Sequence, residues 1–221
     1  IAARMGLPIL PRGSGTSLAG QTIGPAVTID FSRHLNQLLE INAEERSAWV
    51  QPGLVLNAFN ARANKHGLMY GPDPASSDRA TFGGMVGNNS TGAHSISYGM
   101  TSDNVLAIDA LLADGSQSRL ESIKMHAALS RAEADSYEGA LYREALQIRE
   151  TKADAIKQSW PRTWRRASGY SLNYLLPWSP SRPPMWQRSG AGESYPPIEP
   201  GSLNLAPLMV GSEGTLAIFK R

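Results

Sequence analysis

The sequence predicts an α+β fold. Short apolar runs bounded by Pro and Gly predict strands, apolar residues at helical spacing occur in only two places, and segments rich in Gly, Ser and Thr separate them. A doubly wound sheet would need regularly alternating strands and helices, and this chain has no such repeat. Its 221 residues, 41% hydrophobic and 18% charged, suit one large globular domain or two small lobes.

Five short runs predict strands because they are apolar or alternate in polarity. They are residues 7–11, 27–31, 49–50, 105–113 and 216–219. Residues 1–5 resemble a helix end that Gly6 caps, and both chain ends look cut from a longer polypeptide.

Two segments predict longer helices. Over residues 54–66, Val55, Phe59 and Ala63 fall on one stripe, and Gly67 follows as a C-cap. Over residues 135–160, Leu141, Ala145 and Ile148 repeat at helical spacing, and Asp135 with Glu138 is expected to cap the start.

Loops are expected elsewhere. Residues 71–99 contain few helix formers and predict an extended binding loop, and residues 177–202 are rich in Pro, Gly and Ser and predict an irregular loop. We expect the tryptophans after residue 159 to cover a small core of their own: Trp160, Trp164, Trp178 and Trp186.

Composition excludes several classes of function. The chain has no cysteine, which removes disulfides, thiolate metal sites and iron–sulfur clusters from it and fits a reducing compartment. The net charge is only +2, and the densest basic cluster, Arg162, Arg165 and Arg166, is too short for a nucleic-acid footprint. No apolar run reaches the roughly 20 residues of a membrane span.

A glycine-rich loop over residues 12–20 is the sharpest local signal. Consecutive small residues let backbone N–H groups point into one hollow, as phosphate-binding nests require, and Arg12 adds a charge. The Gly-Lys-Ser/Thr of a P-loop is absent, and position 18 is Leu where a Rossmann fingerprint needs Gly. A plain surface turn remains the alternative, and Asp30 is interpreted as a surface carboxylate.

The second loop, residues 71–92, strengthens the case for a cofactor. It offers many backbone donors, the adjacent amides of Asn88 and Asn89, and glycines that allow close approach of a flat ring. Two such loops suggest a large, flat, phosphorylated cofactor; two unrelated loops are the alternative.

Four blocks together resemble the FAD-linked oxidases of the vanillyl-alcohol oxidase / p-cresol methylhydroxylase type. The blocks are residues 11–20, 51–53, 71–92 and 211–216. The segment 169–176 is similar to the D-lactate and D-2-hydroxyglutarate dehydrogenase-like proteins that fuse this domain to a cap and an iron–sulfur region. It is less like the shorter glycolate oxidase subunits.

The resemblance implies a two-lobed FAD-binding domain, with a small mixed sheet, a larger and mostly antiparallel sheet, and flanking helices. The first lobe would be residues 1–45, truncated at its N-terminus. The second would be residues 46–221, with a helical and Pro/Gly-rich insertion at about 121–202. FAD would lie between the lobes without a covalent link, since Thr16 and Ser17 stand where some relatives carry a flavin-linked His.

The resemblance also assigns cofactor-binding residues. The first loop would hold the pyrophosphate, the second loop would pass near the flavin and the ribityl chain, and the last block would lie near the adenosine. The residues are Pro11, Arg12, Gly13, Ser14, Gly15, Thr16, Ser17 and Gln21; Pro52 and Gly53; Pro72, Asp73, Ser76, Thr81, Gly83, Gly84, Asn88, Asn89, Gly92 and Ala93; and Glu213, Gly214 and Ile218.

The implied function is oxidation of a 2-hydroxy acid, of the D-lactate, glycolate or D-2-hydroxyglutarate type, by hydride transfer to flavin N5. The substrate site would include a cap beyond this chain, and electrons would pass to an iron–sulfur region also beyond it, so the chain alone is expected to be inactive. Two alternatives stay open: an FAD-dependent reductase of cell-wall precursor synthesis, and a non-catalytic nucleotide-binding module. A cytoplasmic location is expected, with peripheral membrane association of the full-length protein also open.

No residue of this chain is assigned as a catalytic acid, base or metal ligand. His34, His66 and His126 are expected at the surface, and no histidine pair has metal-ligand spacing. His94 lies within the second loop and is a candidate for contact with the cofactor site, and Glu213 is expected to bind ribose or to support the fold.

Overall fold

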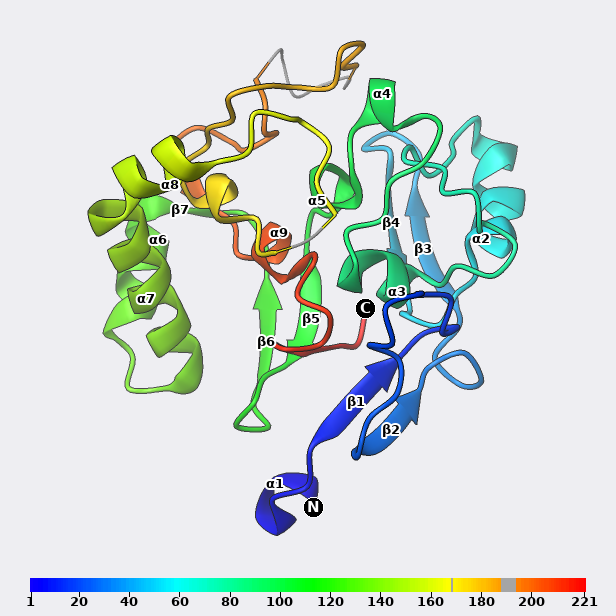
Figure 1. Cartoon of the computed structure of the whole chain (residues 1–221), viewed down its shortest axis with the longest axis horizontal. Helices are drawn as coiled ribbons and strands as arrows, with labels where there is room; N and C mark the ends of the chain where they lie inside the picture. Colours follow the sequence, from blue (N-terminus) through cyan, green and yellow to red (C-terminus); the bar gives the residue numbers. More distant parts are fainter. Residues whose placement is uncertain (168, 188–193) are drawn as a thin grey trace.

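Small sheets with helices beside them make up the computed structural model, which describes residues 1–167, 169–187 and 194–221 (Figure 1). In chain order the elements are α1 (Ala2–Met5), β1 (Ile9–Arg12), β2 (Val27–Asp30), β3 (Leu38–Asn42), β4 (Ser47–Val50), α2 (Leu56–Ala63), the 3₁₀ helix η1 (Asn64–His66), α3 (Phe82–Gly87), α4 (Ser95–Tyr98), α5 (Thr101–Asn104), β5 (Ile108–Leu111), β6 (Gln117–Leu120), β7 (Ile123–Lys124), α6 (Met125–Glu133), α7 (Tyr137–Thr151), α8 (Ala153–Ser159), the 3₁₀ helix η2 (Leu172–Leu175), β8 (Ser202–Leu203), α9 (Ala206–Met209) and β9 (Ile218–Phe219). The α+β prediction is confirmed.

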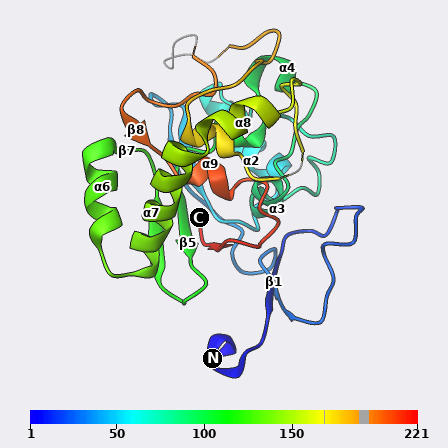
Figure 2. The ribbon, with the colours of Figure 1, turned by 60° about the vertical axis from the view of Figure 1, so that its left-hand side comes forward.

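The first sheet is a parallel pair that projects from the rest of the molecule in both views (Figures 1 and 2). Strand β1 pairs with β2 from Ile9 opposite Val27 to Arg12 opposite Asp30. The connection between them, residues 13–26, contains the first glycine-rich loop and no helix. This differs from a βαβ unit, in which a helix crosses between parallel strands.

A hairpin and a helix form the smaller of two hydrophobic cores. Strands β3 and β4 pair antiparallel, and α2 follows them after Pro52 and Gly53. Helix α2 buries Leu56, Phe59 and Ala63, while Val55 serves as its N-cap. The stripe expected over 54–66 is therefore confirmed, with Leu56 in place of Val55. Phe82 of α3 packs edge-on against Phe59 at 5.0 Å between ring centroids, which ties the second loop to this core.

The larger core lies between the sheet of order β6-β5-β9 and the helices α6, α7 and α9. Strand β9 brings the C-terminal segment back against β5, with Ile218 opposite Leu111. Helices α6, α7 and α8 gather on the side away from α2 (Figure 1). Ala145 of α7 is buried in this core, and Leu141 and Ile148 pack against it, as the spacing predicts.

A buried carboxylate joins the 121–202 region to the body of the protein. Asp103 of α5 is 1% exposed and accepts hydrogen bonds from the Met100 N–H at 2.8 Å and from the hydroxyls of Tyr174 and Tyr195. The Tyr174 hydroxyl also contacts Ser102 at 3.0 Å. The two tyrosines come from η2 and from the segment after residue 193, so one side chain fixes two parts of the later chain.

Several expected elements differ from the structure. Residues 71–99 are not wholly extended, because α3 and α4 form within them; the small residues of α3 permit a tight helix that packs on Pro52 and Thr81. The strand expected over 105–113 is limited to Ile108–Leu111, and Lys152 interrupts the helical region 135–160. Helix α6 was not expected.

The tryptophans do not share one cluster. Trp186 packs edge-on against Tyr195 at 5.0 Å, and the Arg166 guanidinium lies over Trp160. Trp164 lines a surface hollow described below. The expectation of a small core covered by these tryptophans is therefore wrong for the described residues, since Arg166 and Tyr195 contact Trp160 and Trp186 separately and none of the tryptophans belongs to a buried core.

The cap of α7 is Ser136 rather than Asp135. The Ser136 hydroxyl accepts a hydrogen bond from the Gly139 N–H at 3.0 Å. Glu138 instead bonds Ser118 at 2.7 Å and Arg131 at 3.3 Å, because β6 and α6 bring those partners to it.

Replacing the cap should therefore lower stability. We expect Ser136→Ala to reduce the free energy of unfolding by about 1 kcal/mol, since the Gly139 N–H loses its acceptor. Asp135→Ala is the matched control and should change it by less than about 0.5 kcal/mol. Urea denaturation of both variants measures the difference; equal losses would contradict the assignment of the cap.

Candidate functional site

The first wall of the candidate site is the loop that follows β1. The backbone N–H groups of residues 13–17 hydrogen-bond to nothing within the described parts of the chain, and neither do the hydroxyls of Ser14, Thr16 and Ser17. Backbone donors that lack protein acceptors and point into one region form an anion-binding concavity. This loop therefore has the donors that a phosphate or pyrophosphate requires.

The second wall is α3 with the residues just before it. A Cβ at Gly13 would collide with the Thr81 hydroxyl and lie 3.4 Å from the Gly84 Cα, so only glycine lets the first loop approach α3 this closely. The Gly83 N–H donates to the Pro52 carbonyl at 2.7 Å, which fixes the start of α3 against the 51–53 turn.

The third wall is the segment 211–219, about 200 positions away from the first loop in the sequence. The N–H groups of Gly211 and Glu213 donate to the carbonyls of Val86 and Gly87, each at 2.9 Å. The Gln21 amide donates to the Glu213 carboxylate at 3.4 Å. Partial desolvation raises the pKa of Glu213, and the Gln21 hydrogen bond opposes the rise.

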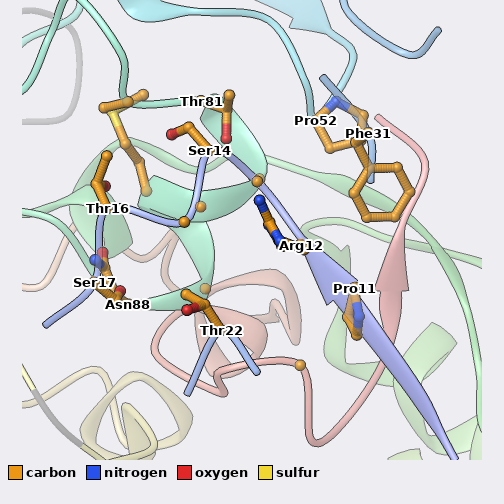
Figure 3. A pocket seen from close by; sticks show the side chains of 18 of the residues that line it. Pro11, Arg12, Ser14, Thr16, Ser17, Thr22, Phe31, Pro52, Thr81 and Asn88 are labelled. Carbon is orange, nitrogen blue, oxygen red and sulfur yellow. The ribbon is translucent and has the colours of Figure 1, made fainter. Parts of the chain in front are cut away.

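The three walls enclose one cavity, which Figure 3 shows with β1 leading into the loop in front of α3. Its lining contains these predicted residues: Pro11, Arg12, Gly13, Ser14, Gly15, Thr16, Ser17, Gln21, Pro52, Ser76, Thr81, Gly83, Gly84, Asn88, Glu213 and Gly214. Segments far apart in the sequence thus meet where the motif blocks suggested they would.

Three buried polar atoms of this lining have no hydrogen-bond partner among the described residues: Arg12 Nε, Gln21 Oε1 and Thr81 Oγ1. Buried polar atoms are normally paired, because an unpaired one costs about 1–3 kcal/mol. Their clustering in one cavity, beside the unpaired N–H groups of the first loop, indicates a polar ligand that supplies both donors and acceptors.

Some predicted residues lie outside the lining because they pack against or hydrogen-bond to other parts of the protein. Gly53 is buried, and a Cβ there would collide with the Phe31 carbonyl. The Asn89 amide donates to the Arg166 carbonyl at 3.3 Å and accepts from the Ser102 N–H at 3.0 Å. Ile218 faces away, while its strand neighbours Ala217 and Phe219 line the cavity, as the two-residue period of a strand requires.

Four further predicted residues lie beside this cavity rather than in it. Pro72 is buried, and Asp73, Gly92 and Ala93 line a second, more open hollow. His94, the candidate for cofactor contact, is exposed and pairs with the Asp73 carboxylate at 3.3 Å without lining either cavity.

The cavity also includes Gly87, one of the second-loop glycines expected to allow close approach of a flat ring, and residues that the sequence did not single out: Thr22, Phe31, Ala80, Met85, Ser90, Ala217 and Phe219. Most of these residues are apolar or small and adjoin a predicted residue in the sequence. Only the alternation of inward-facing and outward-facing positions along the motif blocks could have identified them.

Within the described residues, no group of three or more His, Cys, Asp or Glu could hold a metal ion. His34, His66 and His126 are exposed, as expected. No helix in this part of the chain has both the length and the apolar character that crossing a bilayer requires.

A glycine-rich loop whose N–H groups lack partners among the described residues lines a polar cavity, an arrangement typical of domains that bind phosphorylated cofactors. Comparison with known proteins makes the class specific: the family described as the FAD binding domain matches residues 1–121. The chain belongs to this FAD-binding domain family.

Relatives are similar over different shares of the chain. It is 36% identical to D-2-hydroxyglutarate dehydrogenase of Pseudomonas putida over 98% of its own length and 20% of that protein. It is 41% identical to the glycolate oxidase subunit GlcD of Bacillus subtilis over 49% of its length and 23% of that protein. The chain therefore spans about a fifth of the curated relatives it matches.

A solved structure of alkyldihydroxyacetonephosphate synthase resembles the fold, with a TM-score of 0.55 and 20% identity over 99% of this chain and 27% of that one. At this identity the similarity concerns the fold alone.

The residues present fit FAD. Among the residues that the structure describes, the first loop offers N–H donors without acceptors, and three buried polar atoms without partners line the same cavity. A side chain at Gly13 would collide with Thr81 and keep the loop away from α3.

Proposed function

We propose that this chain holds FAD noncovalently in a flavoprotein dehydrogenase that oxidises a 2-hydroxy acid to the 2-oxo acid. One observation supports this most: three segments distant in sequence converge on a cavity whose loop N–H groups and three buried polar atoms lack partners in the described protein. A dinucleotide has phosphates that accept hydrogen bonds from N–H donors and ring edges that pair with polar side-chain atoms, so it suits such a cavity.

Each part of the site then has a role. The N–H groups of residues 13–17 bind the pyrophosphate, and Arg12 balances its charge. Thr81 and Asn88 meet polar edges of the cofactor, and Gln21 with Glu213 binds the adenosine ribose. When bound, FAD supplies a two-electron acceptor that takes the substrate's α-hydrogen as a hydride. The chain's own residues orient the cofactor and exclude water from its phosphates.

The extent of the similarity favours D-2-hydroxyglutarate within the 2-hydroxy acids. Relatives named D-2-hydroxyglutarate dehydrogenase match 95–99% of the chain, whereas those named glycolate oxidase subunit or D-lactate dehydrogenase match 49–52% of it. The family model matches the chain only as far as residue 121. The residues after 121 are therefore similar to the relatives named D-2-hydroxyglutarate dehydrogenase.

The remaining parts of the enzyme are also proposals. A cap domain outside this chain completes the substrate pocket and supplies the base that takes the hydroxyl proton, and an iron–sulfur region receives the electrons. In this chain we propose lobes at residues 1–45 and 46–221, and peripheral contact of the whole protein with a membrane.

Two measurements on the full-length protein test the proposal. Ligand released by denaturation should have the mass of FAD; FMN alone would contradict a dinucleotide site. Under anaerobic conditions, D-2-hydroxyglutarate should bleach the flavin absorbance band at a rate compatible with turnover, while NADPH without a hydroxy acid should not. Bleaching by NADPH alone would favour the cell-wall reductase instead.

A further inference from the structure

A second hollow adjoins the candidate FAD cavity. Its wall is formed by the second loop, including Asp73, Thr91 and Gly92, and by Trp164 and Arg165 of the later chain. Neighbouring residues of the loop line the two cavities in turn: Ser76 lines the first and Ser77 the second, and Ser90 the first and Thr91 the second. A molecule in the hollow would therefore lie next to the cofactor cavity.

Three contacts hold the 164–166 segment at the rim of the hollow. The Arg165 Nε donates to the Thr91 hydroxyl at 2.9 Å, the Asn89 amide donates to the Arg166 carbonyl at 3.3 Å, and the Arg166 N–H contacts the Met100 sulfur at 3.2 Å. The two contacts of Arg166 restrain the backbone just after Arg165, and the bond from its own Nε orients the Arg165 guanidinium. This placement brings a cation from the later chain to the second loop.

Among the described residues, no carboxylate neutralises the charge of Arg165. No carboxylate lies within 4.0 Å of its guanidinium nitrogens among residues 1–167, 169–187 and 194–221. Asp73, which lines the same hollow, pairs with His94 instead. With Nε engaged by a neutral hydroxyl, the terminal N–H groups form the planar fork that binds a carboxylate through two parallel hydrogen bonds.

We infer that Arg165 binds the distal carboxylate of a 2-hydroxydicarboxylate and thereby selects such substrates over 2-hydroxymonocarboxylates. This inference rests on the proposed function. Glycolate and lactate carry one carboxylate, and relatives named for their oxidation match only about half of this chain. D-2-hydroxyglutarate carries two, and relatives named for it match nearly all of the chain. Arg165 lies beyond the family match that ends at residue 121, in the later region that the relatives named for D-2-hydroxyglutarate match.

Binding of an unreactive dicarboxylate gives a test that is independent of turnover. Isothermal titration of the full-length, FAD-loaded protein with glutarate should show binding that Arg165→Gln weakens about 10- to 100-fold, the range expected for a charged hydrogen-bonded pair. Arg162→Gln is the matched control, because Arg162 is exposed and lines neither cavity, and it should leave the affinity unchanged. Equal glutarate affinity in wild type and Arg165→Gln would overturn the inference.

Kinetics with two five-carbon substrates separates the carboxylates. Arg165→Gln should raise the KM for D-2-hydroxyglutarate about 10- to 100-fold and leave kcat/KM for D-2-hydroxypentanoate, which lacks the distal carboxylate, within about twofold. Equal losses for both substrates would overturn the assignment to the distal carboxylate. If wild type oxidises neither acid, the proposed function fails; if it oxidises both and the variant changes neither, only the role of Arg165 fails.

Discussion

Gly15→Val should remove FAD from the full-length protein while leaving it folded. Gly15 has a φ of +70°, and its N–H belongs to the run of donors that lack partners within the described residues. A valine would resist this φ and turn those N–H groups away from a common anion. It would also place its side chain over Arg12, whose Nε is about 3.5 Å from the position of the new Cβ. Losing two charge-assisted hydrogen bonds, worth about 1.5–3 kcal/mol each, predicts an affinity loss of at least 100-fold.

The measurement is the flavin content of the purified variant, followed by titration of the apoprotein with FAD. Gly115→Val is the control, because Gly115 has a φ of +87° and open space around its Cβ position in the turn between β5 and β6. It should incur similar backbone strain, about 1–3 kcal/mol, and keep FAD. If Gly15→Val retains FAD at wild-type stoichiometry, the pyrophosphate assignment is wrong.

Asp103→Ala should have the second-largest effect: we expect it to lower the free energy of unfolding by about 3–5 kcal/mol. The substitution leaves the Met100 N–H and the hydroxyls of Tyr174 and Tyr195 without their shared acceptor in a buried site. Urea denaturation with fluorescence detection measures the loss. A change below about 1 kcal/mol would show that water or a neighbouring group replaces the carboxylate.

The same carboxylate predicts an unusual dependence of stability on pH. Burial raises the pKa of Asp103 to about 6, although hydrogen bonds from Tyr174, Met100 and Tyr195 and the charge of Arg166 oppose the rise. Between its ordinary pKa of 3.8 and about 6, the folded protein therefore binds the proton more than the unfolded chain does. Its contribution to stability is full below that range and falls as pH rises through it, by about 2–3 kcal/mol.

Asp103→Asn should remove this decline between pH 4 and pH 6. Asp109→Asn provides a contrast of opposite sign, because the hydrogen bond from Arg119 lowers the pKa of Asp109 and its contribution is lost as pH falls. The free energy of unfolding is measured against pH for wild type and for each variant. The difference between wild type and a variant gives the contribution of the carboxylate that the variant lacks. A wild-type minus Asp103→Asn difference that stays constant from pH 4 to pH 6 would contradict the raised pKa.

Local sequence predicted where the cavity forms, because a loop that lets backbone N–H groups face a cavity depends on a short run of small residues. Residues 13–17 directly follow strand β1, which ends at Arg12, and all of residues 12–17 line the cavity. Helices α2 and α7 were also predictable, since their apolar periodicity is local and their buried faces follow it.

Long-range contacts decided which motif residues reach the cavity. Asn89 looks equivalent to Asn88 in the sequence, yet its amide is used by Ser102 and Arg166, while Asn88 lines the cavity. The pairing of β9 with β5 likewise turned Ala217 and Phe219 inward and Ile218 away, because register sets the face of every residue in a strand.

The sequence by itself determined the class of the protein: an α+β domain with a glycine-rich loop and the motif blocks of an FAD-binding domain. Only the tertiary structure decided that Arg165 stands beside the second loop and that Asp103 anchors Tyr174 and Tyr195. The residue types of a short segment determine which hydrogen-bond donors and acceptors it can offer to a ligand. The hydrogen bond from Arg165 to Thr91 spans 74 positions, and such a contact depends on how all the intervening elements pack.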